Sequence, residues 1–365
     1  MQLTLCLTHH CNLRCDYCYG GDKVARHMSL ATGQAAIELG LERTSERLHL
    51  IFFGGEPLTR WASLTKLTET ALERAASKSI ELKTSVTTNG TLLTEQRVAW
   101  LKDHHFITAV SCDGTERAHD TRRRYPSGRG SHRRTIFGLK RALAAGLKVR
   151  VVLVVQPATM SELPASVDYL RGLGATDLVV NPDWSADWET PEIHHAWQAA
   201  YRAVGERYVA AYQAGEPFWI SFIDTKIAAH IKDGFLDTER CDLGRRNLVV
   251  APSGNLYPCD RMVGQDDDDH FVIGHATTGT DLDQVAKLVT AACSLPPECR
   301  DCAVALRCRN RCACANLAMT GSVEVPSATL CFHEQLAIQV ADGAAARLYE
   351  QQNALFLRQH YGASP

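Results

Sequence analysis

Patterns typical of strands and of helices alternate six times between the N-terminus and about residue 215. Apolar stretches such as LHLIFFGG and KVRVVLVVQP are each followed by a stretch with helical spacing, as in WASLTKLTETALERAASK and MSELPASVDYLRGLG. This alternation predicts an α/β fold in which crossover helices join parallel strands. A complete eight-fold barrel would need two further units, so we expect a partial (β/α)6 TIM-like barrel.

The unusual short motifs of this region come directly after predicted strands. They are the cysteine-rich loop at 11–18, GGEP at 54–57, TTNG at 87–90, SCDG at 111–114 and NPDW at 181–184. In β/α barrels the active site collects at the carboxyl ends of the strands. The motifs are therefore expected to contribute to one shared site.

Composition excludes several classes of protein. The 365 residues carry a formal net charge of −2, which gives no overall basic field for nucleic acid. No apolar run approaches the ~20 residues that a membrane helix needs, and the N-terminus lacks the layout of a secretory signal. We expect a cytoplasmic protein that binds neither nucleic acid nor membrane.

Fourteen cysteines are unevenly distributed along the chain, and in a reducing compartment such clusters indicate metal ligands or catalytic thiols. Three lie in the first loop and nine lie between Cys241 and Cys331, whereas Cys6 and Cys112 stand alone as expected core residues. We expect a barrel at 1–215, a linker at 216–235, a cysteine-rich domain at 236–335 and a C-terminal helix at 336–365. The DDDD run at 266–269 is expected to be a solvated loop rather than a metal site.

The first loop contains Cys11, Cys15 and Cys18 in the spacing C-x3-C-x2-C. Closely spaced thiolates of this kind hold iron–sulfur clusters. Three cysteines leave one iron of a 4Fe–4S cube without a protein ligand, as a catalytic zinc keeps one open position. The alternative is a zinc loop that takes its fourth ligand from His9 or His10.

This motif, with Tyr17 before its last cysteine, resembles that of the radical S-adenosylmethionine (radical SAM) superfamily. The resemblance implies that the open iron chelates S-adenosylmethionine and that one electron from the cluster cleaves the cofactor to a 5′-deoxyadenosyl radical. That radical abstracts a hydrogen atom from the substrate, while the protein positions and shields the cofactor. Tyr17 is then expected near the adenine.

Further motifs match the family in order and spacing, although GG and NG are also common turns and the arginine-rich stretch could be a solvated loop. GGEP resembles the turn that meets the methionine amino group, and HDTRRRYPSGRGS resembles a motif whose arginine meets the carboxylate. TTNG and SCDG resemble further strand ends beside the cofactor. The cofactor-binding residues implied by the resemblance are Tyr17, Gly54, Gly55, Glu56, Pro57, Thr88, Asn89, Ser111, Asp113 and Arg123.

The second cysteine group resembles the SPASM domain of radical SAM enzymes, which holds two auxiliary 4Fe–4S clusters, so that three clusters are implied in all. By this resemblance Cys299, Cys302, Cys308 and Cys331 bind the second auxiliary cluster, and Cys241, Cys259 and Cys312 bind the first. The first cluster then lacks one cysteine ligand: its iron is open to substrate, or Cys314 or Cys293 completes it. Two zinc sites are the alternative from spacing alone.

Asp260 directly follows Cys259 and resembles the catalytic base of anaerobic sulfatase-maturating enzymes. A carboxylate beside a cluster could accept the substrate proton. The same YPCD sequence also occurs in peptide maturases, so Asp260 could instead order the cluster loop.

The leading hypothesis for the function is a radical SAM/SPASM enzyme that installs a thioether, C–C or C–O cross-link in a ribosomally made precursor peptide. The alternatives are a sulfatase maturase that oxidises Cys or Ser to formylglycine, and a zinc-stabilised binding protein. Against the maturase, FFGGEP lacks the glutamine that usually precedes the glycines. Expected partners are the precursor peptide, a separate leader-recognition protein and an electron donor such as flavodoxin or ferredoxin.

Overall fold

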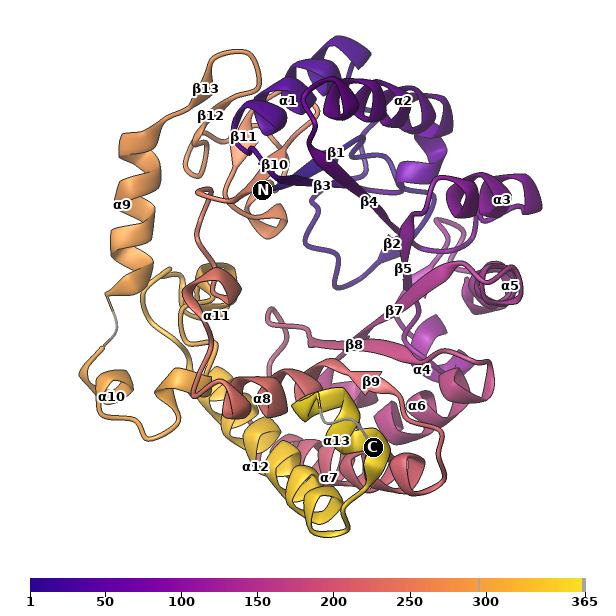
Figure 1. Ribbon diagram of the computed structural model, residues 1–365, viewed down its shortest axis with the longest axis vertical. Helices are drawn as coiled ribbons and strands as arrows, with labels where there is room; N and C mark the ends of the chain where they lie inside the picture. Colours follow the sequence, from indigo (N-terminus) through magenta and orange to yellow (C-terminus); the bar gives the residue numbers. More distant parts are fainter. Residues whose placement is uncertain (295, 363–365) are drawn as a thin grey trace. The chain divides into compact units, whose positions relative to one another are not determined.

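A computed structural model describes residues 1–294 and 296–362 of the chain, which divide into two compact units (Figure 1). The first unit contains residues 1–112, 119–149 and 242–290. The second contains residues 113–118 and 150–241 together with the described residues from Ala291 on. Each unit draws on separate parts of the sequence, so each depends on contacts between distant segments.

The first unit is built on parallel strands that are largely buried. Strands β1 (Gln2–Cys6), β3 (Arg47–Phe53), β4 (Glu81–Thr88) and β5 (Ile107–Ser111) pair in this order, all parallel. Leu3 and Leu5 on β1, and Leu50 and Phe52 on β3, have no exposed surface. On β3 every second residue is buried, as the pleat of a strand requires when one face lies in the core, and β1 is buried from Leu3 to Cys6.

Two strands from the cysteine-rich region extend the same sheet. β10 (Asn247–Val250) pairs parallel with β1, in a register that sets Leu248 beside Leu3, and β11 (Leu256–Tyr257) pairs antiparallel with β10. The pairing is long-range and comes from a region whose sequence did not continue the helix–strand alternation. The domain boundaries expected at 215 and 236 stay a prediction, because the compact units follow contacts and cut across them.

The helices of the first unit begin at side chains that satisfy their free N–H groups. Ser29 caps α1 (Leu30–Glu42) and Thr94 caps α3 (Glu95–Asp103), each by accepting a hydrogen bond from a backbone N–H three residues on. α2 (Trp61–Ser77) packs against α1, and α5 (His132–Ala144) follows the arginine-rich loop.

The second unit continues the alternation of strand and helix. β7 (Lys148–Val155, all but its first two residues), β8 (Asp177–Pro182) and β9 (Trp219–Ile220) are parallel, with α6 (Leu163–Gly172), α7 (Pro191–Gln213) and α8 (Ser221–Ile231) between and after them. Together with β1, β3, β4 and β5, strands β7 and β8 are the six expected from the sequence. The predicted α/β class with parallel strands is confirmed.

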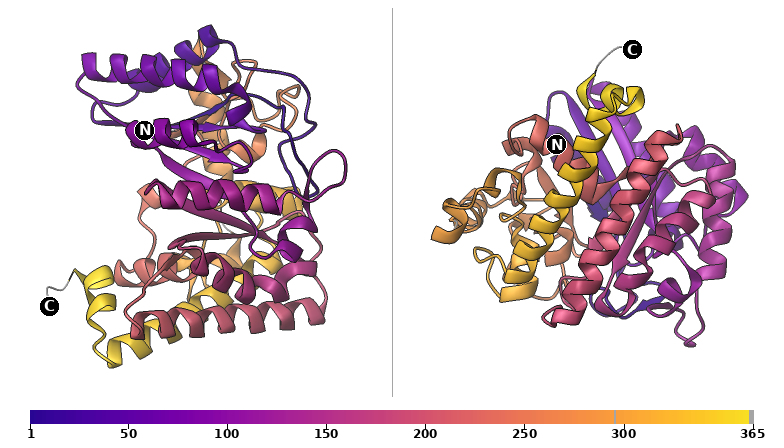
Figure 2. Two further views of the ribbon diagram at one scale, coloured as in Figure 1. Left: turned by 90° about the vertical axis from the view of Figure 1, so that its right-hand side faces the viewer. Right: turned by 90° about the horizontal axis from the view of Figure 1, so that it is seen from below.

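The C-terminal part of the second unit is helical. α12 (Ala328–Glu350) lies along α7 (Figure 2) and also packs on α8. In place of one terminal helix over 336–365, α12 starts earlier and a second helix, α13 (Ala354–Tyr361), follows it. Gln352 has a positive φ of 50° and the Asn353 side chain caps α13, which explains the break; residues 363–365 lie outside the described part. No helix in the described residues is long and apolar enough to cross a membrane.

The pairing of β10 with β1 predicts energetic coupling between two segments about 245 residues apart in the chain. Replacing Leu3 or Leu248 with alanine should each lower the free energy of unfolding by about 2–5 kcal/mol, because both side chains are fully buried. The loss of unfolding free energy in the double variant should differ from the sum of the two single losses by about 0.5 kcal/mol or more. Urea unfolding of the four proteins measures this, and strict additivity would contradict a shared core.

Candidate functional site

The cysteine loop leaves β1 and returns to it. Backbone hydrogen bonds run from His9 N to Arg26 O and from Met28 N to Leu7 O. Cys11 is buried, Cys15 is half-buried and Cys18 is exposed, and the three thiols lie within electrostatic range of one another. Burial, reinforced by the Glu56 charge, raises the pKa of the Cys11 thiol to about 12.

The donors around these thiols suit ligated thiolates. The backbone N–H of Leu13 donates to Cys11 Sγ at 3.4 Å, and Lys23 Nζ lies 3.0 Å from Cys18 Sγ. Among the described residues no three His, Cys, Asp or Glu side chains form a group that could hold a single metal ion. A four-iron cube is larger than one ion, so its thiolates stand farther apart. The loop therefore fits the predicted cluster in donor type and grouping.

Gly54 and Gly55 are required by the backbone of this loop. Gly55 N donates to Thr8 O at 2.7 Å and Glu56 N donates to His10 O at 2.9 Å. A Cβ on Gly54, whose φ is +119°, would lie 2.4 Å from Thr8 O, and a Cβ on Gly55 would lie 2.2 Å from His10 O. The close approach that these glycines allow is thus to the start of the cysteine loop. Their predicted contact with a cofactor stays a prediction.

Glu56 joins the end of β3 to the end of β4. Its fully buried carboxylate accepts hydrogen bonds from Leu58 N at 3.0 Å, Thr88 Oγ1 at 2.8 Å and Asn89 N at 2.8 Å. Burial raises the pKa of Glu56, while the bonds from Asn89, Leu58 and Thr88 oppose that rise. Both carboxylate oxygens are therefore engaged inside the protein, where they fix the positions of Thr88 and Asn89. Pro57 is buried at the start of the following turn.

Asn89 supports the first cysteine through residues that the sequence did not single out. Asn89 Nδ2 donates to Asn12 Oδ1 at 2.8 Å and lies 3.8 Å from Cys11 Sγ. Asn12 Nδ2 in turn donates to Thr91 Oγ1 at 2.9 Å, and the Thr91 hydroxyl donates to Asn89 Oδ1. This closed set of amide and hydroxyl groups ties the TTNG turn to the cysteine loop.

Arg123 and Tyr17 lie in contact beside the cysteine loop. Cys15 pairs with Arg123 in a two-stranded antiparallel ribbon of β2 (Arg14–Cys15) and β6 (Arg123–Arg124). Arg123 is buried, its guanidinium donates to Tyr17 Oη at 2.5 Å, and its carbon Cζ stands 5.8 Å from the centre of the Tyr17 ring. The arginine loop is therefore part of the cysteine site.

The remaining residues of the arginine motif shape its loop. The Ser131 hydroxyl donates to Arg123 O at 2.8 Å and is 3.0 Å from His119 Nε2. Asp120 Oδ1 accepts from His132 N at the start of α5, and a Cβ on Gly130 would lie 2.0 Å from the Asp120 carboxylate. The histidine, aspartate, glycine and serine of this motif thus hold the backbone that presents Arg123.

Ser111 and Asp113 follow β5 and belong to different units. Ser111 ends the strand and is half-buried. Asp113 is buried, and its Oδ1 accepts a hydrogen bond from Val154 N of β7 at 3.0 Å. One carboxylate oxygen of Asp113 therefore fixes a strand, and its predicted cofactor contact stays a prediction.

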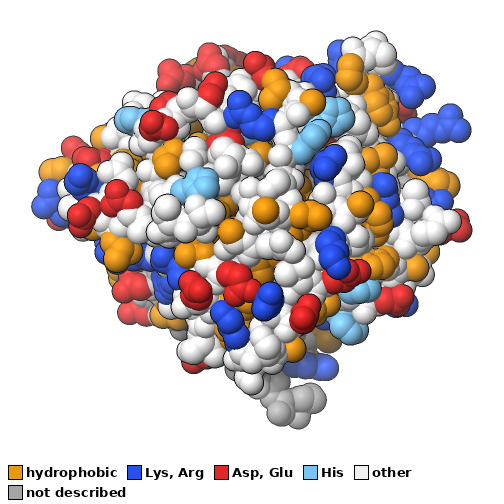
Figure 3. Space-filling view, turned by 90° about the horizontal axis from the view of Figure 1, so that it is seen from above, with side chains coloured by type: hydrophobic (Ala, Val, Ile, Leu, Met, Phe, Trp, Pro, Cys, Tyr) orange, Lys and Arg blue, Asp and Glu red, His pale blue; other side chains and the backbone are white. Residues whose placement is uncertain are grey.

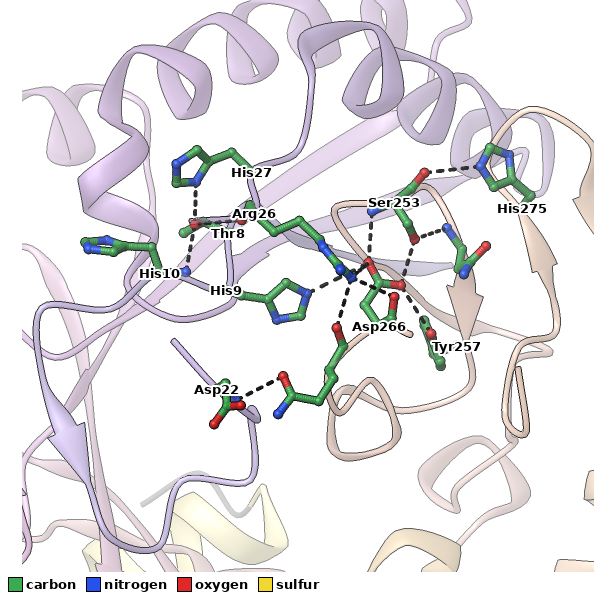
Figure 4. A network of polar contacts seen from close by, with 12 residues as sticks. Thr8, His9, His10, Asp22, Arg26, His27, Ser253, Tyr257, Asp266 and His275 are labelled. Atoms are coloured by element: carbon green, nitrogen blue, oxygen red, sulfur yellow. Dashed lines mark hydrogen bonds and ion pairs between the residues drawn. The ribbon is translucent and has the colours of Figure 1, made fainter. Parts of the chain in front are cut away.

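Asp266 corrects the interpretation of the DDDD run (Figure 4). Residues 267–269 are exposed, as expected, but the Asp266 side chain is fully buried with φ +58°. It accepts hydrogen bonds from Ser253 N, Ser253 Oγ and Tyr257 Oη, and lies 3.8 Å from both His9 Nε2 and an Arg26 nitrogen. Burial alone would raise the pKa of this carboxyl, but the nearby His9 and the hydrogen bonds from Ser253 and Tyr257 outweigh it and hold the pKa below its usual value.

Asp260 lies against the cysteine loop. Its carboxylate accepts a hydrogen bond from Tyr19 Oη, one residue beyond Cys18, and the Cys259 thiol is 3.4 Å from Asp260 Oδ1. The Arg261 guanidinium stands over the Tyr19 ring at 4.5 Å. The candidate base is therefore half-buried beside both a predicted cluster ligand and the loop that carries the first three cysteines.

Four cysteines of the second unit lie near one another. The thiol of Cys331 interacts electrostatically with those of Cys299, Cys302 and Cys308. Burial raises the pKa of the Cys308 thiol and that of Cys331. These are the four ligands implied for the second auxiliary cluster, and the structure groups them although Cys331 comes from α12.

The predicted ligands of the first auxiliary cluster fall in both units, since Cys259 belongs to the first and Cys241 and Cys312 to the second. Cys314 Sγ is 3.7 Å from Cys312 Sγ, so the chain brings this candidate fourth ligand close despite its short spacing, while Cys293 is exposed at the end of α9 (Leu282–Cys293). A cavity of about 260 Å³ in the second unit is lined by three cysteines, three arginines, one glutamate and one phenylalanine: Cys241, Cys308, Cys312, Arg240, Arg309, Arg311, Glu239 and Phe235.

A buried ion pair holds the backbone on both sides of Cys308. Lys226 Nζ of α8 lies 2.6 Å from Glu334 Oε2 of α12, and each side chain is 2% exposed. Lys226 also donates to Arg307 O at 3.0 Å, and Glu334 accepts from Arg309 N at 2.6 Å. Burial lowers the pKa of Lys226. Burial alone would raise the pKa of Glu334, but hydrogen bonds and the nearby cations hold it below its usual value.

This pair generates a prediction about stability. Lys226→Met should lower the free energy of unfolding by about 3–5 kcal/mol, because it leaves the Glu334 carboxylate buried without its cation. Arg347→Met is the matched control: it removes the cation from the Arg347–Glu206 pair, whose side chains are 44% and 66% exposed, and should cost about 1 kcal/mol or less. Urea unfolding of anaerobically purified protein measures both losses. Equal losses would show that the buried pair stabilises the fold no more than an exposed pair does.

The glycine contact generates a second prediction. Gly55→Ala should displace the His10 backbone and lower the iron bound by the first loop several-fold, since the added Cβ meets backbone rather than a movable side chain. Gly172→Ala is the control, because nothing lies within 4 Å of its Cβ position. Iron and sulfide per chain after anaerobic reconstitution, compared with a Cys11/Cys15/Cys18→Ala triple variant, measure the loss. Full iron in Gly55→Ala would contradict the role given to this contact.

Comparison with known proteins identifies the first part of the chain. Residues 5–170 match the model of the radical SAM superfamily. The serine-type anaerobic sulfatase-maturating enzyme of Klebsiella aerogenes is 24% identical over 324 residues, which cover 83% of this chain and 76% of that protein.

Solved structures share the fold over most of the chain. The structure described as native anSMEcpe with bound AdoMet superposes with a TM-score of 0.80 at 18% identity, covering 97% of this chain and 99% of that one. The structure of Streptococcus suis SuiB bound to precursor peptide SuiA gives 0.61 at 17% identity, covering 90% and 75%. At these identities the likeness shows the fold, and it confirms the architecture expected from the alternating pattern.

Proposed function

Because residues 5–170 of this enzyme form a radical SAM domain, we propose that Cys11, Cys15 and Cys18 hold a 4Fe–4S cluster whose open iron binds S-adenosylmethionine. When bound, this group supplies a 5′-deoxyadenosyl radical. The chain's own residues position it: Asn89 and Asn12 brace Cys11, and the buried Arg123 offers a cation for the cofactor carboxylate. Tyr17, held by Arg123, supplies an aromatic face for the adenine.

The proposed substrate is a side chain of a peptide or protein. Sulfatase-maturating enzymes and SuiB, whose structure holds a precursor peptide, are both among the similar proteins. SPASM-type auxiliary clusters would accept the electron that the oxidation releases. They would be held by two sets of cysteines: Cys299, Cys302, Cys308 and Cys331 in one, and Cys241, Cys259 and Cys312 in the other. The grouping of the first set around Cys331 supports this assignment.

The observation that carries the proposal is the position of Asp260 against the cysteine loop through Tyr19. Removal of a hydrogen atom leaves a substrate radical, and a two-electron oxidation then requires one proton and one further electron to leave. A carboxylate at the edge of the loop is placed to take that proton. Asp260 is the proposed proton acceptor, and the hydrogen bond from Tyr19 holds its carboxylate in place.

Phe53 favours cross-linking over formylglycine formation. This residue occupies the position where sulfatase maturases usually carry a glutamine, directly before the two glycines. Its partly buried side chain packs against an apolar cluster that includes Cys6, Ala251 and Tyr257. A phenylalanine there offers no amide to a polar reacting group. We therefore propose a side-chain cross-link in a ribosomally made peptide; the overall similarity to sulfatase-maturating enzymes supports formylglycine formation as the second candidate.

Mass spectrometry of the product tests the proposal. The enzyme is incubated anaerobically with S-adenosylmethionine, a reductant and either a precursor peptide encoded beside its gene or a peptide with a sulfatase maturation sequence. Loss of two hydrogens per bond, without an aldehyde, is expected for the precursor. An aldehyde formed on the sulfatase peptide would instead support formylglycine formation, the second candidate function, and contradict cross-linking. Zinc in place of iron and sulfide in the purified protein would reject both.

Asp260→Asn should separate radical formation from product formation. The amide keeps the shape of the side chain but is not a base, so 5′-deoxyadenosine should still form while product falls at least about tenfold, as loss of a general base predicts. Asp267→Asn, an exposed aspartate in the same segment, is the matched control and should leave both unchanged. Quantifying 5′-deoxyadenosine and product in one reaction checks this; a normal yield of product would show that Asp260 only orders its loop.

A further inference from the structure

The segment from 121 to 149 is strongly basic. It contains nine lysines and arginines and no aspartate or glutamate, in a chain whose net charge is −2. Several of these cations are exposed: Arg124, Arg129, Arg133, Arg134, Lys140 and Lys148. Figure 3 shows blue Lys and Arg side chains gathered toward the upper right of the face that it presents. Such a concentration of one sign creates a local field that the net charge conceals.

This segment borders the cysteine loop directly. Asp16 N donates to Arg122 O at 3.2 Å, beside the pairing of Cys15 with Arg123. From α5, Arg134 Nε donates to Thr91 O at 3.0 Å, and Thr91 is bonded to Asn12, the neighbour of Cys11. The segment that carries the exposed cations is therefore hydrogen-bonded to the cysteine loop and, through Thr91, to the neighbour of Cys11.

The exposed surface of α5 also has the composition of a protein interface. Phe137 is 52% exposed, and the guanidinium carbons of Arg134 and Arg141 lie 5.7 and 4.4 Å from its ring centre. Arginine and aromatic residues are enriched where proteins bind one another. Among the described residues Arg133 and Lys140 make no ion pair, whereas Arg122 pairs with Asp16 and Arg141 with Glu95. The surface retains positive charge that nothing else on the described chain neutralises.

We propose that this basic patch, formed by Arg129, Arg133, Arg134, Phe137 and Lys140, docks an acidic one-electron carrier protein that reduces the cluster at Cys11, Cys15 and Cys18. The inference rests on the radical SAM part of the proposed function. Each transfer moves one electron: the anionic hydroquinone of a flavin carrier becomes the neutral semiquinone, and the cluster gains the electron. A peptide substrate is the weaker candidate for this surface, because its reacting side chain must reach the cofactor rather than the exposed surface of α5.

Charge reversal tests the docking surface. Arg129→Glu/Arg133→Glu places acidic residues on an exposed loop and in the first turn of α5, where a negative charge suits the helix dipole, so folding should be preserved. Lys66→Glu/Lys287→Glu makes the same change of charge at exposed positions on α2 and α9 and is the matched control. 5′-Deoxyadenosine formation is measured with reduced flavodoxin, its reductase and NADPH, and separately with dithionite.

The flavodoxin-driven rate of the patch variant should fall about fivefold or more at low ionic strength, while the dithionite-driven rate stays unchanged. Added salt should slow the flavodoxin-driven reaction of the unmodified enzyme and have less effect on the variant. An unchanged flavodoxin-driven rate, an equal loss with dithionite, or an equal loss in the control would each overturn the proposal. The proposal would also be overturned if the patch variant bound the precursor peptide more weakly but was reduced normally by flavodoxin.

Direct binding separates this inference from the proposed function. Titration of the enzyme with flavodoxin in a calorimeter requires no turnover, so it reports on docking even if the enzyme proves to act on something other than a peptide. Binding that weakens about tenfold in Arg129→Glu/Arg133→Glu and not in the control supports the patch. Equal affinities for the unmodified and patch-variant enzymes would overturn it whatever the reaction.

Discussion

The contact between Gly54–Gly55 and the backbone of Thr8–His10 is the constraint on which the rest of the first unit's site depends. Two parallel strands end side by side there, and the missing Cβ atoms let the second strand end pass within hydrogen-bond distance of the first loop. The next residue, Glu56, then uses its buried carboxylate to hold the end of β4. Two glycines and one carboxylate thus set three strand ends in a fixed relation before any cofactor binds.

A second set of polar groups ties the cysteine-rich sequence to this arrangement. Asp266 binds Ser253 and Tyr257 beyond β10 and approaches His9 and Arg26 of the cysteine loop, while Asp260 accepts from Tyr19. A buried carboxylate such as that of Asp266 is costly unless it is hydrogen-bonded, so its bonds specify one position for the segment. The candidate base is consequently held by the same loop that carries the first three cysteines.

Much of this could be predicted from the sequence, because the signals are local. The period of strands and helices predicted parallel strands, and the motifs with cysteines and glycines predicted loops that the structure brings into contact. What sequence patterns did not provide are partners far apart in the chain. The role of Asn12 becomes visible only when Asn89 and Thr91 lie beside it. The pairing of β10 with β1 joins segments some 245 residues apart. Lys226 and Glu334 look like ordinary helix residues in the sequence and form their ion pair only when α8 and α12 pack. Asp266 was hidden in a run of four aspartates whose other members are exposed, as composition suggests.

The arginine loop joins the inner and outer sides of the site in one short sequence. Its single buried cation, Arg123, turns inward to Tyr17, while its neighbours Arg124 and Arg129 point their charge to solvent. The loop backbone is held by His119, Asp120, Gly130 and Ser131. The exposed arginines are therefore not needed to hold it. A loop whose backbone is held from within can carry many like charges on its surface at little cost in folding, since solvent screens them. That division explains how exposed positive charge can persist in a segment that pairs with the cysteine loop.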